Sequence, residues 1–522
     1  MLRDRTAEAF DRALRRLDGA PAAAVLKEYA ARLAAPMRVA VIGRVSSGKS
    51  TLTNALLGSR LVPTGIEELT YNVNWLRYAP EPSLTVHFKD GSPAQHRTLD
   101  ELEKLTARRE EHRSLLAAID FIEVFFANDQ LRIFDLIDTP GLDSHYGADS
   151  QNTLRFLGRT GAQVRDATVA HARGADALVL VFGRSMSRVD EEALAELQGP
   201  ELASLTPITA IGVLTKVEHY WPAGPDPLGR ARQVADRLMT EGPVRRLLFD
   251  VTPVGSLVGA AAETFTECDL EHLRQLATVA PEQLANRVRR GEYFCTRPYD
   301  DLPVPAAIRR PLFELFGPWG IVLATQLIRD GAEDQAQLRA QLLERSGLTE
   351  LRRLISSHFG NRAHLIKLQR VVADIRQLAR QPNSANGPQP GSANRPQPGP
   401  ALAEVVAEFD RLALNEHAFE ELIVLRHYYN GELDLTEDDA AELLRVTGEH
   451  GVWVTDRLGL DRRATLEEMY ARAQQRLAYW ADRDTDPGLI GATSAAARTL
   501  RRSYERLVYH IGAARRHLEL VQ

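Results

Sequence analysis

The sequence predicts an α/β domain with a mostly parallel sheet, joined to an extended all-α helical bundle. Three observations lead to this fold class. Short β-branched runs alternate with helical patterns up to about residue 254, as they do in domains built from βαβ units. The first such run ends in a glycine-containing turn that opens a helix. From about residue 265 the strand patterns stop, and Leu, Ala, Arg and Glu recur at helical spacing as far as Gln522.

The elements follow in order along the chain. Residues 1–35 have apolar positions at helical spacing and are expected to form a helix. Strands are expected at 38–43, 72–78, 84–88, 120–126, 131–138, 176–183, 208–214 and 248–254. Between the strands, helices are expected at 49–58, ending at Gly58, at 98–118, which is highly charged, and near 189–198.

Changes in composition divide the chain into five parts. We expect an N-terminal helix at 1–35 that packs with a helical neck, an α/β domain at 36–262, a first helical part at 263–381, a linker at 382–400 and a second helical part at 401–522. The linker contains the tandem repeat SANGPQPG–SANRPQPG, which has nothing to bury in a core and is typical of a flexible connection between helices.

Bulk composition excludes several classes of protein. The net charge of the 522 residues is −6, so nothing indicates nucleic acid as a partner. Two cysteines provide neither metal spacing nor a disulfide framework, which favours the cytoplasm. The polar N-terminus does not resemble a signal peptide, and no window reaches the roughly 18 to 20 apolar residues that span a bilayer. We therefore expect membrane contact, if there is any, to be peripheral.

The strongest motif is GRVSSGKS at 43–50, which fits G-x-x-x-x-G-K-[ST] between a strand and a helix. Glycines let such a loop fold around phosphates, and the N–H groups at the start of the helix point at the anion. Lys49 is expected to reach the β and γ phosphates, and the Ser50 hydroxyl to ligate Mg²⁺. The predicted nucleotide-binding residues of this loop are Gly43, Arg44, Val45, Ser46, Ser47, Gly48, Lys49, Ser50 and Thr51.

Three weaker motifs at strand ends favour GTP over ATP. Asp138 and Gly141 form D-x-x-G, in which the carboxylate holds Mg²⁺ through water and the glycine N–H senses the γ-phosphate. Thr215, Lys216 and Glu218 resemble [NT]-K-x-D, whose carboxylate accepts both N–H donors of guanine. Glu218 is one methylene longer than the usual aspartate, so guanine selectivity is less strongly predicted than phosphate binding. Gly255 and Ser256, after the last expected strand, complete the predicted nucleotide-binding set.

A switch threonine that closes on Mg²⁺ is expected in the segment LVPTGIEELTYNV. Thr64 and Thr70 are both candidates, and Thr70 is preferred because it directly precedes the next strand. The predicted metal ligands are therefore Ser50, Thr70 and Asp138, and the predicted catalytic residues are Ser46, Lys49, Thr70 and Gly141.

Several longer stretches resemble one family. Residues 71–137, between Thr70 and Asp138, provide an insertion larger than that of small regulatory GTPases. This enlarged head, together with the stretches RLAAPMRVAVIGRVSSGKSTLTNALLG, FGPWGIVLATQLI, LLERSGLTELRRLI and HAFEEL, resembles the bacterial dynamin-like proteins, in particular the mycobacterial isoniazid-inducible dynamin-like GTPases. The P-loop is common to many NTPases, whereas LLERSGL and HAFEEL are more specific to this family.

The resemblance implies a membrane-associated GTPase whose heads pair across the nucleotide and whose helical stalk touches lipid. It also implies a second dynamin-like partner encoded nearby. Ser46 falls where dynamins carry a catalytic loop serine, but Val45 replaces the glutamine that eukaryotic dynamins use to place the attacking water. Leu142 replaces the water-orienting glutamine of Ras-like enzymes. Hydrolysis is therefore expected to be slow or to depend on dimerisation or a partner.

Three stretches compete for membrane contact. Residues 316–328 are apolar, and a buried helix is the preferred interpretation. The linker has no aromatic residue, Leu or Ile to insert. The helix at 497–520 carries six arginines, and the outer face of a packed helix is preferred to a lipid-binding face. Sequence alone thus leaves four functions open: a dynamin-like GTPase at the inner face of a bacterial membrane, a regulatory GTP switch without lipid remodelling, a catalytically weak scaffold, and ATP hydrolysis, which is the least favoured.

Overall fold

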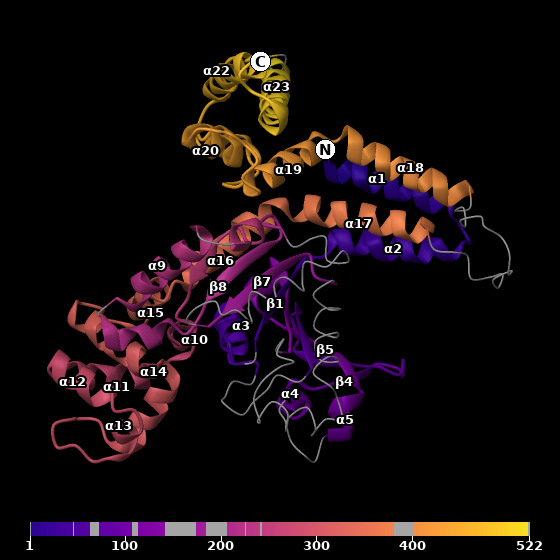
Figure 1. Cartoon of the computed structure of the whole chain (residues 1–522). Helices are drawn as coiled ribbons and strands as arrows, with labels where there is room; N and C mark the ends of the chain where they lie inside the picture. The colour runs from indigo at the N-terminus through magenta and orange to yellow at the C-terminus, as the bar shows by residue number, and fades with distance from the viewer. Residues whose placement is uncertain are drawn as a thin grey trace. The chain divides into compact units, whose positions relative to one another are not determined.

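The computed structural model divides the chain into two compact units, which we treat separately (Figure 1). The sheet unit is Arg38–Ser356, and the helical unit combines Met1–Met37 with Ser357–Gln522. The structure describes residues 2–44, 46–62, 72–106, 113–140, 174–183, 206–224, 226–240, 243–380 and 400–519.

Within these residues the sheet has nine strands in the order β4-β3-β5-β2-β6-β1-β7-β8-β9. The strands are β1 (Met37–Gly43), β2 (Val73–Tyr78), β3 (Ser83–Phe88), β4 (Gln95–Arg97), β5 (Ile119–Phe126), β6 (Phe134–Asp138), β7 (Ala177–Phe182), β8 (Ala210–Leu214) and β9 (Val251–Pro253). Parallel pairing links β1 to β7, β7 to β8, β8 to β9 and β2 to β5. Pairing is antiparallel between β2 and β6, between β3 and β5, and between β3 and β4.

The sheet confirms the predicted fold class and provides a strand for each of the eight expected runs. The short strand β4 was missed because Gln95–Arg97 is polar and two of its three residues are exposed, so it has no apolar face to reveal it. The expected strand at 131–138 begins only at Phe134, after the 3₁₀ turn η3 (Asp129–Arg132). The expected helix at 98–118 appears as η1 (Leu99–Glu101), α4 (Leu102–Thr106) and α5 (Arg113–Ala118). The expected helix near 189–198 lies outside the described residues.

The other helices of this unit pack on the sheet or on one another. They are α3 (Lys49–Leu57), η5 (Val217–Ala223), α9 (Pro227–Thr240), η6 (Pro243–Arg246), α10 (Ser256–Thr264), α11 (Glu267–Ala277), α12 (Pro281–Val288), α13 (Glu292–Thr296), α14 (Ala306–Arg329), α15 (Gln335–Arg345) and α16 (Leu348–Leu354). The division between units thus differs from the boundary expected at residue 262. Helices α11 to α15 belong with the sheet because their buried leucines, among them Leu270, Leu273 and Leu338, join the core formed by β7, β8, β9 and α10.

Helix α14 is, within the described residues, the one helix long and apolar enough to cross a membrane by length and composition. No such helix was expected, because no window of the sequence reaches the apolar length that spans a bilayer. However, half of its most apolar window is buried, and Gly317 interrupts the helix with φ 65° and ψ 175°. Phe316, Trp319 and Ile321 lie in the core of the sheet unit. This burial agrees with the preferred interpretation of 316–328 as a core helix.

The helical unit begins with four helices that pack together: α1 (Leu2–Arg16), α2 (Pro21–Ala34), α17 (Ala363–Arg380) and α18 (Pro400–Asn415). Figure 1 shows the N-terminal pair, in indigo, beside the orange pair α17 and α18. Phe10 and Phe409 meet edge to face, with ring centroids 4.8 Å apart. The single helix expected at 1–35 is two helices, because Gly19, with φ 77°, and Pro21 break the helical backbone between them.

The remaining helices of this unit are α19 (His417–Tyr429), α20 (Glu437–Val446), α21 (Val454–Leu458), α22 (Leu466–Asp484) and α23 (Gly491–Glu519). The short helices η7 (Ile355–Phe359), a π-helix, and η8 (Gly360–Arg362) precede α17. Four arginines of α23 pair with acidic residues on neighbouring helices: Arg498 and Arg501 with Asp484, Arg502 with Glu420, and Arg515 with Glu467. These pairs favour the packed-helix interpretation of 497–520. The expected linker at 382–400 lies almost entirely outside the described residues.

Candidate nucleotide site

The phosphate-loop motif has the strand–loop–helix context that the sequence predicts. Strand β1 ends at Gly43 and helix α3 begins at Lys49. Two loop residues have left-handed backbone, Ser46 with φ 58° and Gly48 with φ 96°. A Cβ on Gly43 would lie 2.4 Å from the Val181 carbonyl oxygen, which real side chains do not tolerate. The close approach of β1 to β7 therefore requires glycine at the start of the loop.

The lysine of the motif is buried, with 7% of its surface exposed. Its ammonium donates hydrogen bonds to the carbonyl oxygens of Gly43, at 3.0 Å, and Arg44, at 2.8 Å. The side chain is therefore curled into the loop that precedes it. A phosphate oxygen would be a stronger partner than these neutral carbonyls, because both partners of that hydrogen bond would be charged.

Asp138 lies at the end of β6 and is fully buried. One carboxylate oxygen accepts a hydrogen bond from the Thr53 hydroxyl on α3, at 3.3 Å. The other oxygen has no hydrogen-bond partner among the described residues. Burial raises the pKa of Asp138 to about 6, while Lys49 and Thr53 oppose that rise. A buried carboxylate oxygen left without a partner fits a Mg²⁺ ion or its bound water.

The segment after β8 touches the phosphate loop directly. The Thr215 hydroxyl lies within hydrogen-bonding distance of the Ser47 carbonyl oxygen and, at 2.8 Å, of the Phe182 carbonyl oxygen. Lys216 has left-handed backbone with φ 57°. Glu218 lies in the first turn of η5, where burial raises the pKa of its carboxyl group and Lys216 opposes that rise.

The last strand places a further helix terminus nearby. Gly255 and Ser256 follow β9 and begin α10. The Gly255 N–H donates to the Ser346 carbonyl oxygen at 2.8 Å. The Ser256 hydroxyl is buried and has no hydrogen-bond partner among the described residues. The Ser256 hydroxyl is therefore available to form a hydrogen bond with a bound ligand.

The sheet topology explains why these segments converge. Strands β1, β7, β8 and β9 are parallel neighbours, so their carboxyl ends lie at one edge of the sheet, the edge at which open α/β sheets bind ligands. The residues that meet there are Gly43, Arg44, Ser46, Ser47, Gly48, Lys49, Ser50, Thr51, Thr215, Lys216, Glu218, Gly255 and Ser256, and Asp138 joins them through Thr53. Val45, Thr64, Thr70, Gly141 and Leu142 lie outside the described residues.

Sequence reasoning missed two residues of α3 that support this site. Thr53 donates to Asp138. The Asn54 side chain donates to the Val62 carbonyl oxygen, at 2.7 Å, and accepts from the N–H groups of Leu61 and Val62, at 3.0 and 2.8 Å. Asn54 thereby holds the chain that leads towards Thr64 and Thr70. The available signal was a pair of adjacent polar residues between the apolar residues Leu52 and Ala55 of a short helix.

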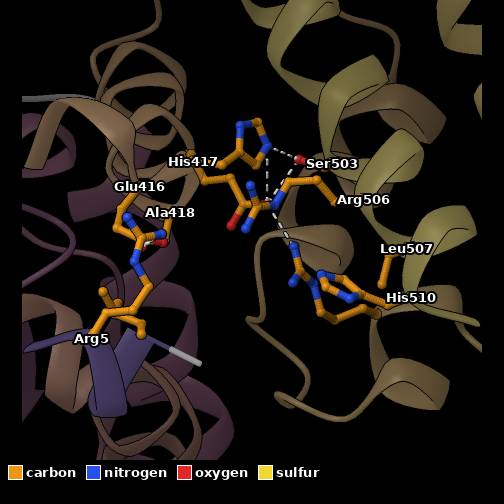
Figure 2. Close-up of a pocket in the computed structure, with 11 residues that line it drawn as sticks. Arg5, Glu416, His417, Ala418, Ser503, Arg506, Leu507 and His510 are labelled. Atoms are coloured by element: carbon orange, nitrogen blue, oxygen red, sulfur yellow. Dashed lines mark hydrogen bonds and ion pairs between the residues drawn. The ribbon is translucent and has the colours of Figure 1, made fainter. Parts of the chain in front are cut away.

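A separate cavity of about 370 Å³ lies within the helical unit. Figure 2 shows His417 and Ser503 facing each other, with 2.7 Å between the His417 Nε2 and Ser503 Oγ atoms. Several of the polar groups that line the cavity pair with one another: Ser503 and Arg457 both donate to Glu421, at 2.8 and 2.6 Å, and Arg5 pairs with Glu416. No predicted nucleotide-binding residue lines this cavity. We therefore interpret the ion pairs and hydrogen bonds of this cavity as contacts that stabilise the packing of helices.

The site defines a P-loop nucleotide-binding domain, and comparison identifies its class. Residues 39–217 match the model of the dynamin family. The chain is 30% identical over 494 residues, covering 94% of this chain and 93% of the relative, to the isoniazid-induced protein IniC of Mycobacterium tuberculosis. The chain therefore belongs to the dynamin family, among the bacterial dynamin-like proteins similar to IniC.

More local similarities exist. The chain is 36% identical over 132 residues to dynamin-like protein 2 of Campylobacter jejuni, covering 25% of this chain and 20% of that protein. It is also 36% identical over 121 residues to the GTPase Der of Azorhizobium caulinodans, covering 20% of this chain and 25% of that protein. A solved structure of an oligomerised bacterial dynamin pair matches at 14% identity and a TM-score of 0.31, covering 94% of this chain and 87% of that chain.

Proposed function

We propose that this protein binds GTP with Mg²⁺ and hydrolyses it to GDP and phosphate. The observation that carries the proposal is the convergence of the phosphate loop, Asp138 and the Thr215–Glu218 segment at one sheet edge. Membership of the dynamin family supports the same activity. Mg²⁺ would neutralise phosphate charge, and Ser50, Thr70 and Asp138 are the proposed residues that hold it directly or through water.

The chain's own residues have distinct roles in this proposal. Lys49 exchanges its two carbonyl partners for phosphate oxygens. The backbone of 43–51 supplies N–H groups at the start of α3, and Gly141 adds the N–H that senses the γ-phosphate. Ser46, which is exposed and has left-handed backbone, is the loop residue proposed to contact the reacting phosphate. Val45 offers no side-chain group to orient water, so turnover is proposed to be slow until heads associate or a partner completes the site.

Guanine is the proposed base. Its N1–H and N2 amino group need a carboxylate acceptor, and Glu218 lies at the strand end where such an acceptor belongs. Thr215 and Lys216 complete the base-reading segment, and Gly255 and Ser256 are proposed to close the same end of the site. The local similarity to a protein named GTPase Der supports guanine over adenine.

The protein is further proposed to act peripherally at the inner face of a bacterial membrane, with self-association through its heads and a second dynamin-like protein as partner. Two of the three stretches considered for lipid contact are buried or paired. The structure offers another: Val452 and Trp453 precede α21 and are 57% and 66% exposed. Arg462 and Arg463, just after α21, are exposed as well. An aromatic side chain next to cations suits the interface of an anionic bilayer.

The test of the proposed activity is nucleotide binding and phosphate release with Mg²⁺, comparing GTP with ATP. Wild-type protein should bind GTP more tightly than ATP and release phosphate, and Lys49→Ala should do neither. Equal affinity for ATP would contradict the assignment of Glu218 as a guanine reader.

A catalytically weak, switch-like GTP-binding protein is the second candidate. The observation that favours it is the presence of Val45 and Leu142 where related GTPases carry water-orienting glutamines. Tight GTP binding with no phosphate release at any protein concentration would favour this candidate over the enzyme.

A further inference from the structure

The segment Ser346–Arg352 touches the helix that begins at the phosphate loop and the helix that begins at Gly255. This segment lies within LLERSGLTELRRLI, a stretch typical of the family for which the proposed function provides no role. Its contacts are all inside the sheet unit. They reach the C-terminal ends of α3 and α10, away from the proposed nucleotide site, and also the start of α10.

Arg352 caps the C-terminal end of α3. Its guanidinium donates to the carbonyl oxygens of Ala55, at 2.8 Å, and Leu56, at 2.9 Å. These carbonyls belong to the last turn of α3, where they have no partner four residues further along the same helix. A cation at this end also complements the helix dipole, and its side chain is only 18% exposed, so water screens the interaction weakly. The same α3 carries Lys49 and Ser50 in its first turn.

The same guanidinium reaches α10. It pairs with the Glu263 carboxylate at 2.6 Å, and Arg339 of α15 pairs with the other Glu263 oxygen at 3.1 Å. Glu263 lies in the last turn of α10 and is 14% exposed. Arg352 therefore joins the C-terminal ends of two helices whose N-terminal ends both lie at the nucleotide edge.

The segment also fixes the start of α10. The Gly255 N–H donates to the Ser346 carbonyl oxygen at 2.8 Å. Gly347 has φ 76°, and a Cβ there would lie 2.5 Å from the Pro253 carbonyl oxygen, so the chain packs tightly against the end of β9. One segment thus holds α10 at both ends and α3 at one.

We propose that Arg352, through Glu263, is a positioning residue for nucleotide binding: it sets the spacing between the phosphate-binding helix α3 and the base-side helix α10. Each helix has nine residues, a rod of roughly 13 Å, so displacement at the C-terminal end moves the N-terminal end as well. A nucleotide bridges the two N-terminal ends, and its affinity depends on their separation. This inference rests on the proposed nucleotide-binding function.

The test compares Arg352→Met with Arg353→Met, which removes the same charge from an exposed neighbour on the same helix. Full-length proteins are titrated with fluorescent GTP and GDP analogues in Mg²⁺, and KM, kcat and Tm are measured in parallel. Arg352→Met should weaken the affinity for both nucleotides by roughly tenfold, as expected from losing hydrogen bonds to a charged group. It should raise KM by a similar factor and leave kcat within about twofold, because no reacting atom is touched. Arg352→Lys should recover part of the affinity, and Arg353→Met should match the wild type.

Hydrogen exchange in the nucleotide-free proteins gives an independent readout. Arg352→Met should speed exchange in 49–57 and 256–264, whereas Arg353→Met should not. Glu263→Gln keeps the side-chain shape, so it should reproduce the loss of affinity even if Arg352→Met fails to fold. A lower Tm with unchanged affinity and unchanged exchange would show a merely structural role and overturn the inference. If wild-type protein binds no nucleotide, the proposed function itself fails; if wild type binds and the Arg352 and Glu263 variants bind equally well, only this inference fails.

Discussion

Single residues decide whether the loop at 43–49 can close around an anion. Gly48 has φ 96°, and a Cβ there would lie 3.2 Å from the Thr215 hydroxyl. Gly91 also has left-handed backbone, with φ 76°, but nothing lies within 4 Å of a Cβ placed there. Left-handed backbone favours glycine at both positions, whereas close contact with a neighbouring side chain restricts only Gly48. Comparing variants at the two positions therefore distinguishes these two effects.

Gly48→Ala is predicted to reduce nucleotide affinity strongly, whereas Gly91→Ala is predicted to leave it unchanged. Each variant should lose about 1–2 kcal/mol of stability from the left-handed backbone alone, and Gly48→Ala should lose more because of the contact with Thr215. Urea unfolding and titration with a fluorescent GTP analogue measure the two effects. Equal affinities for the two variants would mean that the loop does not bind the nucleotide.

Buried carboxylates make stability depend on pH. Burial raises the pKa of Asp135 to about 6, although Arg77 and Arg38 oppose that rise, and Asp138 is raised to a similar value. The unfolded values are near 3.9, so between about pH 4 and 6 the folded state binds more protons than the unfolded state. The free energy of unfolding of the nucleotide-free protein should therefore fall as pH rises through this window and change little from this source above it.

Asp135→Asn should flatten that dependence, and urea unfolding of both proteins from pH 4.5 to 7 measures it. Subtracting the free energy of unfolding of the wild type from that of the variant at each pH removes the contribution of the titrating groups that both proteins contain. If the free energy of unfolding depends on pH in the same way in the variant and the wild type, the assignment of a raised pKa to Asp135 is contradicted.

GTP binding should weaken below about pH 6, since Asp138 must be ionised to hold Mg²⁺.

At the scale of elements, the buried side chains of a helix, and not its exposed ones, stabilise its packing. Phe409 on α18 is fully buried against Phe10, whereas Leu414 on the same helix is 77% exposed. Phe409→Ala should destabilise the helical unit by about 3–5 kcal/mol, the usual cost of deleting a buried ring. Leu414→Ala should change stability by less than about 0.5 kcal/mol. Equilibrium unfolding of the full chain provides both values, and similar losses in the two variants would contradict the packing of α1 on α18.

Strands and helices with a clear pattern of apolar residues could be predicted from the sequence. Elements that form only because they pair with a neighbouring element could not. Buried runs such as Ala177–Phe182 have β-branched or apolar residues throughout and leave little alternative to a strand. Strand β4 exists only because it pairs with β3. Similarly, the motif residues of the site were readable as G-x-x-x-x-G-K-S, D-x-x-G and TKVE, each tied to a chemical need. Thr53 and Arg352 act through contacts distant in sequence, and Asn54 acts through a loop seven and eight residues further on, so none of the three belongs to a motif of known spacing.

At the scale of the whole molecule, the central question is whether the nucleotide chemistry is used at a membrane. Trp453→Ser is predicted to reduce co-sedimentation with vesicles containing anionic lipid, because an exposed ring is replaced by a group with no affinity for the interface. Tyr293→Ser is the matched control, since Tyr293 is 53% exposed but lies in the sheet unit. Sedimentation that is equal for wild type and Trp453→Ser would exclude this loop as the lipid contact, and no sedimentation of wild type would favour the switch-like function.

Head association makes a separate prediction for turnover. If a second copy completes each site, the rate per molecule should rise with protein concentration, because neither Val45 nor Leu142 supplies a water-orienting side chain. A rate per molecule independent of concentration would indicate a self-sufficient head.

The most direct test of the account is GTP turnover across a range of protein concentrations, with ATP as the competing nucleotide and Lys49→Ala as the control. We predict GTP-selective phosphate release that rises more than linearly with protein concentration and is lost in Lys49→Ala. Phosphate release that survives in Lys49→Ala, or wild-type protein that neither binds nor hydrolyses GTP, would contradict it.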